Sequence, residues 1–165
     1  MAIVTVLILV ILDLFSKTMA DRYLADGLIV EVIPGFFNFE WDFNTGAAWN
    51  LLAEYSWGTT VLAVVSLAIS AVVLYYLQRC RGFKSKVVLI LIATGGIGNL
   101  VDRVRLGRVT DFLSFTFGSY RFPTFNLADS FVTVGVILAI IFLIIDRDFS
   151  YELAGRCPPG KGDNA

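Results

Sequence analysis

The sequence predicts a membrane protein whose fold class is an all-α bundle of four transmembrane helices, with a small β-sheet and a short interfacial helix outside the membrane. Composition is the first observation. The 165 residues are 57% hydrophobic and only 16% charged, whereas an ordinary soluble domain is about a quarter charged. Four long apolar segments are the second observation. The third is the period-two alternation of apolar and polar residues between them, which is typical of half-buried strands.

The four apolar segments have lengths typical of membrane spans, and we expect spans at residues 2–19, 58–77, 87–100 and 130–145. The second has no charged residue, and its length is about what a bilayer core requires. The first resembles a signal peptide superficially. It has no basic residue at its start and no convincing cleavage site after it, so we interpret it as a retained span.

The polar segments between the first and second spans, and between the third and fourth, predict the sheet. Apolar and polar residues alternate over residues 37–44 and again over 113–117. We expect 28–33 to pair with the first strand and 120–122 with the second, because turn residues separate each pair. Residues 49–57 are rich in Trp, Tyr and Leu, and this composition favours a short helix in the membrane interface.

Loop charges predict the orientation of the bundle. Lysine and arginine are slightly more frequent in residues 78–86 and in the C-terminal tail than in the other polar segments. The positive-inside rule then places both termini in the cytoplasm, and residues 21–57 and 102–129 outside it. We predict a single membrane domain over residues 1–148. The tail, 149–165, ends in a run of Pro, Gly and polar residues and is expected to be disordered.

Composition also excludes several classes of function. The chain has no histidine, which removes the Ser-His-Asp triad, the Cys-His pair and most zinc sites. The net charge of −1 disfavours nucleic acid as a partner. Cys80 and Cys157 lie far apart without metal-type spacing, so we expect two free thiols. We predict neither a metal nor another cofactor.

Two aspartates stand where polar segments meet apolar ones. Asp111 precedes a strand-like segment, and Asp129 precedes the fourth span. Two carboxylates held close together cannot easily both ionise, so such a pair shares a proton and can act as general acid and general base. The alternative is that each is a helix cap or a solvated acid. Spacing alone does not decide between these interpretations.

Asp13 and Lys17 are four residues apart in the first span, hence on one face of a helix. An internal ion pair lowers the cost of keeping both charges in the membrane, so we interpret the pair as structural. An alternative is a Ser–Lys protease in which Lys17 is the base. The serines that could then be nucleophiles are Ser114, Ser119 and Ser130.

Further polar and small residues lie near these acids. Asn44 and Gly46 belong to an Asn-Thr-Gly-Ala-Ala segment that can bind a peptide backbone or simply form a turn. The glycines at 95, 96 and 98 favour close helix packing in a membrane. We expect a polar network that positions the acids, with the members Asn99, Asp102, Arg103 and Asn126. A surface ion pair between Asp102 and Arg103 is the simpler possibility.

Five sequence blocks, in this order, resemble the lipoprotein signal peptidase family (signal peptidase II), membrane aspartic endopeptidases of bacteria. The resemblance covers roughly residues 5–146. Leu14 stands where the family often has Gln, and Trp49 where Phe is common. The blocks are D-L-F-S-K (13–17), F-N-T-G-A-A-W (43–49), G-G-I-G-N-L-V-D-R (95–103), V-T-D-F (109–112) and F-N-L-A-D-S (125–130).

The resemblance implies an enzyme of the bacterial inner membrane that removes signal peptides from prolipoproteins, cutting before a diacylglyceryl-modified cysteine. It implies Asp111 and Asp129 as the catalytic dyad, supported by Asn44, Gly46, Asn99, Arg103 and Asn126. Asp13, Lys17 and Asp102 would be structural polar residues. The implied fold adds an extracytoplasmic β-cradle, and we expect a monomer that contacts membrane lipids. The remaining alternatives are the Ser–Lys protease and a non-enzymatic four-span carrier or scaffold.

Overall fold

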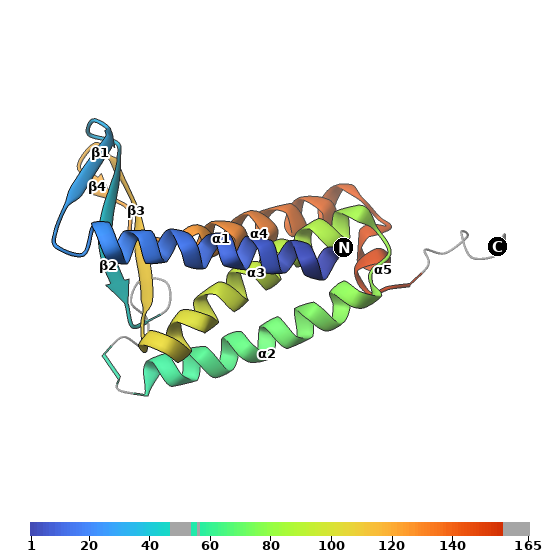
Figure 1. Ribbon diagram of the computed structural model, residues 1–165. Helices are drawn as coiled ribbons and strands as arrows, with labels where there is room; N and C mark the ends of the chain where they lie inside the picture. Colours follow the sequence, from blue (N-terminus) through green and yellow to red (C-terminus); the bar gives the residue numbers. More distant parts are fainter. Residues whose placement is uncertain (47–53, 56, 157–165) are drawn as a thin grey trace.

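Four helices long and apolar enough to cross a membrane form the body of the molecule. The computed structural model describes residues 1–46, 54–55 and 57–156. A four-stranded antiparallel sheet caps one end of the bundle, and the N-terminus and a short fifth helix lie at the other end (Figure 1). The elements are α1 (Ala2–Tyr23), β1 (Ile29–Ile33), β2 (Phe37–Asn44), α2 (Gly58–Arg79), α3 (Phe83–Leu106), β3 (Val109–Phe117), β4 (Tyr120–Arg121), α4 (Leu127–Ile145) and α5 (Phe149–Leu153).

Helix α3 is the centre of the bundle and contacts α1, α2 and α4. It is longer than its apolar run predicts, beginning at Phe83 and ending at Leu106. Lysine and arginine are good helix formers, so the charged residues at both ends continue the helix beyond the apolar core. Gly107 stops it in a left-handed conformation with φ +67°, which glycine adopts without strain. This extension puts Asp102 and Arg103 on the helix.

The outer faces of the helices are apolar, as expected of spans in contact with lipid. On α1, for example, Ile3, Leu7 and Ile11 are exposed. The interior of the bundle holds small apolar residues, including Val6, Val88 and Ala93. It also holds charged residues, which is unusual at membrane depth and by default indicates function or specific pairing.

The predicted sheet is confirmed, with strand order β1-β2-β3-β4 and every neighbouring pair antiparallel. We call this sheet the cradle. Strand β2 has the predicted bounds, but β3 begins at Val109 instead of Leu113. Its first four residues are all buried, so they lack the period-two alternation that marks a half-exposed strand. Asp111 therefore lies inside a strand and does not precede one.

The predicted C-terminal tail and the predicted interfacial helix both lie partly outside the described residues. The tail prediction is wrong at its start, because residues 149–153 form helix α5. Phe149 is fully buried and its ring lies 5.4 Å from that of Phe142, so an aromatic anchor holds this helix against the bundle. Residues 157–165, with Cys157, lie outside the described residues. Most of the predicted interfacial helix at 49–57 also does, and that helix stays a prediction.

Candidate active site

The two aspartates are brought together by a short strand-like contact just before α4. The backbone N–H groups of Phe112 and Leu113 both donate to the carbonyl of Phe125, at 3.0 and 2.8 Å, and Phe125 donates back to Leu113 at 3.1 Å. This pairing ties the residue before Asn126 to the middle of β3. The first turn of α4 therefore lies beside Asp111.

Asn126 bridges the two carboxyl groups. Its Nδ2 donates to Oδ1 of Asp111 at 2.6 Å. Its Oδ1 accepts from the backbone N–H of Asp129 at 3.0 Å, and its own N–H donates to Oδ2 of Asp129 at 3.2 Å. These two bonds form a capping box at the start of α4. Asp129 thus caps the helix and is also linked to Asp111 through Asn126, so the two sequence interpretations are compatible.

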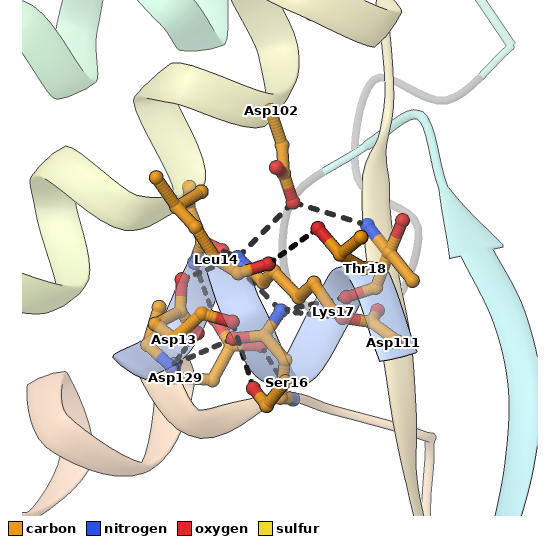
Figure 2. A network of polar contacts seen from close by, with 12 residues as sticks. Asp13, Leu14, Ser16, Lys17, Thr18, Asp102, Asp111 and Asp129 are labelled. Atoms are coloured by element: carbon orange, nitrogen blue, oxygen red, sulfur yellow. Dashed lines mark hydrogen bonds and ion pairs between the residues drawn. The ribbon is translucent and has the colours of Figure 1, made fainter. Parts of the chain in front are cut away.

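Asn99 connects the aspartate pair to a second polar cluster. Its Nδ2 donates to Oδ1 of Asp129 at 2.7 Å, and its Oδ1 accepts from Nζ of Lys17 at 2.9 Å. Figure 2 shows Asp111 and Asp129 beside Lys17, with Asp13 and Asp102 around the same lysine. Asn99 on α3 therefore links Asp129 of the aspartate pair to the ion cluster around Lys17.

Lys17 is the centre of a buried ion network. Its Nζ lies 2.9 Å from Oδ2 of Asp13 and 3.1 Å from Oδ2 of Asp102, in addition to the bond to Asn99. The predicted pairing of Lys17 with Asp13 is confirmed. The surface pair of Asp102 with Arg103 is wrong, because Asp102 turns into the bundle and is only 3% exposed.

The same network argues against Lys17 as a catalytic base. An ammonium group has three donors, and here all three have acceptors, two of them carboxylates. Lys17 is also only 2% exposed. A Ser–Lys protease needs a neutral lysine in contact with a serine hydroxyl. In the described part of the chain, the serine next to it, Ser16, donates to the backbone carbonyl of Asp13 at 2.7 Å.

Close helix packing makes room for this arrangement. Oδ1 of Asp13 accepts from the backbone N–H of Ala128 at 2.8 Å, which ties α1 to the start of α4. A methyl group on Gly98 would meet the Asp13 carboxylate and Ala128, and one on Gly95 would meet the Ala128 backbone. The prediction that these glycines permit close helix contact is therefore confirmed.

Arg103 and Asn44 lie at the edge of the pair. Nη2 of Arg103 donates to the carbonyl of Gly46 at 3.1 Å, and Nη1 donates to that of Asn99 at 3.4 Å. The backbone N–H of Gly46 donates to Oδ1 of Asn44 at 2.8 Å. The segment after β2 is thus a turn held by Asn44 and anchored to α3 by Arg103. Ala47 and Ala48 lie outside the described residues.

The electrostatic setting favours a protonated Asp111. The residue is only 3% exposed. Burial raises the pKa of Asp111 to about 7, and the nearby Asp129 acts in the same direction. The hydrogen bond from Asn126 and the charge of Lys17 act to lower it. A carboxyl group with a pKa near neutrality, beside a second carboxyl group, can give and take protons at physiological pH.

An open cavity of about 540 Å³ reaches Asp111 from the cradle side. It supplies the space that a substrate would need next to the pair. We call it the groove, and it is lined by Asp42, Phe43, Asn44, Asp111, Arg121, Phe122, Pro123 and Thr124.

Two residues at this site were missed by reasoning from the sequence. Asp42 lines the groove. The sequence signal for it is its position two residues before Asn44, because residues two apart in a strand lie on the same face of the sheet. Thr110 is fully buried, and its N–H faces Asp102 at 3.4 Å while its hydroxyl donates to Asp21 at 3.0 Å. Nothing in the sequence pairs Thr110 with Asp21, because the contact depends on how α1 meets the cradle.

Comparison with known proteins gives a consistent result. Residues 5–145 match the family model described as signal peptidase (SPase) II. A lipoprotein signal peptidase from Symbiobacterium thermophilum is 39% identical, over 88% of this chain and 95% of the relative. One from Bacillus pumilus is also 39% identical, over 84% and 89%. A solved bacterial membrane enzyme superposes with a TM-score of 0.78 at 34% identity, over 90% of this chain and 89% of that one.

Proposed function

The chain belongs to the signal peptidase II family, and on this premise we propose that it removes signal peptides from diacylglyceryl-modified prolipoproteins by an aspartate-dyad mechanism. The observation that carries the proposal is the pair of carboxyl groups of Asp111 and Asp129, bridged by Asn126 at the end of an open groove. Asp111 lies on strand β3 of the cradle and Asp129 in the first turn of α4, at the end of the helix bundle that the cradle caps. A scissile bond held there by a lipid anchor would be near the membrane surface.

We assign the protons of the resting dyad from the contacts of each acid. Asp129 accepts N–H bonds from Asn99 and Asn126, which suits a carboxylate. Asp111 is buried and has a pKa near 7, which suits the protonated member. The ionised Asp129 takes a proton from a water molecule while the water oxygen forms a bond to the scissile carbonyl carbon. Asp111 gives its proton to the carbonyl oxygen.

The tetrahedral intermediate then returns the dyad to its starting state. The C–N bond breaks, the leaving amine takes the proton held by Asp129, and a hydroxyl proton of the intermediate returns to Asp111. The products are a carboxylic acid and an amine, and no covalent acyl-enzyme forms. Asn126 keeps both acids in register because it contacts both at once. Arg103, close to the pair, offsets part of their negative charge.

The other elements of the proposal concern location and assembly. From the slightly more basic loops at the α5 end, we infer that this end lies in the cytoplasm and the cradle outside it. The enzyme would therefore act on the outer side of the bacterial cytoplasmic membrane, as a monomer in contact with lipid. The diacylglyceryl chains of the substrate would lie along the exposed apolar helix faces. These assignments rest on sequence composition and family membership.

The test is cleavage of a defined precursor by purified protein in detergent. A diacylglyceryl-modified precursor and its unmodified counterpart are incubated with wild type, Asp111→Asn and Asp129→Asn, and products are resolved by gel shift. Asn keeps the shape of Asp, and the amide oxygen can still accept from Asn126. Asp26→Asn, in an exposed turn, is the matched control.

We expect wild type and Asp26→Asn to cut only the lipidated precursor and both dyad variants to be inactive. Normal cleavage by either dyad variant would rule out the mechanism. A trapped acyl-enzyme would favour a Ser–Lys protease. Folded wild type that cleaves neither precursor would favour the carrier or scaffold, and flux across vesicles would then be measured.

A further inference from the structure

The groove beside Asp111 carries a negative charge that the dyad mechanism does not use. Asp42 on β2 lines this cavity together with Asp111. The two residues are direct cross-strand partners in the β2–β3 ladder. Asp111 is the protonated, neutral member of the resting dyad, so the negative charge of this cross-strand pair is that of Asp42. Asp42 therefore sets the charge on this side of the groove.

The local geometry keeps Asp42 at the groove wall. The β2–β3 register is irregular between Phe39 and Asp42, and such irregularities re-aim side chains beside active sites. Oδ2 of Asp42 accepts from the Thr124 hydroxyl at 2.7 Å, and Oδ1 accepts from the N–H of Phe43 at 2.8 Å. Both donors are neutral, so these contacts orient the carboxylate without cancelling its charge.

The basic residue of the groove does not offset this charge, because it is already paired. Nη2 of Arg121 contacts Oε2 of Glu40 at 2.5 Å, so the two charges largely cancel. Within the described residues, the salt bridges do not include Asp42. The charge left along the groove is thus that of Asp42, with the dyad at its end. A peptide segment lying in the groove would meet a negative wall.

We propose that Asp42 is a specificity-determining residue, which makes the groove reject precursors that carry an acidic residue next to the cleavage point. The inference rests on the proposed function, since it concerns the substrate of the same site. An acidic substrate residue would approach Asp42 and the dyad together, whereas a neutral or basic residue would not be repelled. Asp42 is exposed to solvent, so we expect a moderate effect of about 3- to 10-fold in kcat/KM, reduced at high salt.

The experiment uses the full chain in detergent with matched lipidated precursors. Asn and its isostere Asp are compared at the residue immediately before the lipidated cysteine and, separately, at the residue immediately after it. The measured quantity is the ratio of kcat/KM for the Asn precursor to that for the Asp precursor. This ratio is insensitive to a general loss of activity. The enzymes are wild type, Asp42→Asn, Asp42→Lys and the control Asp26→Asn.

We expect wild type and Asp26→Asn to show a ratio of about 3 to 10 at one of the two positions at least. Asp42→Asn should bring that ratio near 1, and Asp42→Lys should invert it. Because Asp42→Lys changes the sign of the effect, it tests the charge even if Asp42→Asn folds poorly.

Several outcomes would overturn the inference. One is a wild-type ratio near 1 at both positions with all precursors cleaved, which leaves the proposed function intact. Another is a wild-type ratio that persists in both Asp42 variants. A folded wild type that cleaves no lipidated precursor would overturn the proposed function and this inference together.

Discussion

Two clusters of aspartates meet at Asn99, and they differ in how their charge is balanced. Asp13 and Asp102 surround the ammonium group of Lys17 in the closed interior of the bundle. Asp111 lines the groove, and within the described part of the chain its side chain and that of Asp129 accept hydrogen bonds only from Asn99 and Asn126. The aspartates of the first cluster are paired with a cation, whereas those of the second have no salt bridge among the described residues. The first cluster therefore joins α1 to α3 through its ion pairs, whereas the second is the pair that we propose to hold a movable proton.

The sharpest way to test this contrast is to neutralise one acid of the open pair. We expect Asp111→Asn to lower kcat/KM at least about 1,000-fold, since general acid–base catalysis is lost. Its stability should not fall. The pKa of Asp111 is about 7 in the folded protein and about 3.9 in an unfolded chain. The folded state therefore binds more protons between these values, and wild-type stability declines as pH rises through that window.

Thermal unfolding in detergent at pH 5 and pH 8 measures the stability part of this prediction. Wild type should lose stability between the two values relative to Asp111→Asn, because the variant has no proton to release there. A variant that is inactive because it is unfolded at both pH values would contradict our account of Asp111.

Removing the cation of the closed cluster should lower stability, whereas Asp111→Asn should lower activity without lowering stability. Lys17→Met leaves Asp13 and Asp102 buried without a counter-charge, which typically costs about 3–5 kcal/mol. We expect a large drop in the unfolding temperature and little folded protein. Lys86→Met is the matched control, because Lys86 is exposed, and its effect should stay within about 0.5 kcal/mol. Equal unfolding temperatures for the two variants would show that the buried network does not stabilise the fold.

The two clusters also differ in how far the sequence predicted them. The Asp13–Lys17 pair follows from helical spacing alone, and the spans and β2 follow from hydropathy and alternation. The partners from distant elements do not. Asp102 reaches Lys17 because α3 continues past its apolar run as far as Gly107, and hydropathy alone does not show this extension. Asn126 bridges both acids only because Phe125 pairs with β3, and no local pattern encodes that contact.

Elements with residues buried on both faces are the second kind of feature that local sequence patterns do not predict. The first half of β3 has no alternation because it is buried, so the sequence predicts a strand that begins only at residue 113 and puts Asp111 before it. The sequence does not predict α5 either, because this helix is too short to show periodicity and is anchored by a single buried aromatic ring, that of Phe149. In both places packing between elements, which a single sequence does not display, overrides the local pattern.

The close packing of α3 against α1 and α4 at Gly98 gives a test with a smaller expected effect. A methyl group on Gly98 would press on the Asp13 carboxylate and on Ala128, and overpacking of this kind typically costs about 1–3 kcal/mol. Gly96→Ala is the control on the same helix, since its methyl group would meet only the side chain of Ser70. Alanine also favours a helix over glycine by about 1 kcal/mol. We expect Gly98→Ala to unfold at the lower temperature, and the reverse order would contradict this packing.

The smallest expected effect concerns the proton of the open pair. We expect kcat/KM to fall as pH rises past about 7, because Asp111 then loses the proton that the dyad needs. The groups that act on it are Asp129 from α4, Asn126, Lys17 from α1, Asp42 from β2 and, across the site, Arg103 from α3.

Asp42 acts on Asp111 less strongly than Asp129, Asn126 and Lys17 do, and it raises the pKa of Asp111. Asp42→Asn should therefore move the alkaline limb of the profile slightly to lower pH, while Asp26→Asn leaves it in place. A shift to higher pH would contradict the assigned sign, because removing a nearby negative charge must make the carboxylate of Asp111 easier to form. If the wild-type limb lies far above neutrality, Asp111 is not the group that carries the proton. The open pair would then owe its reactivity to Asp129, whose contacts are hydrogen bonds from Asn99 and Asn126.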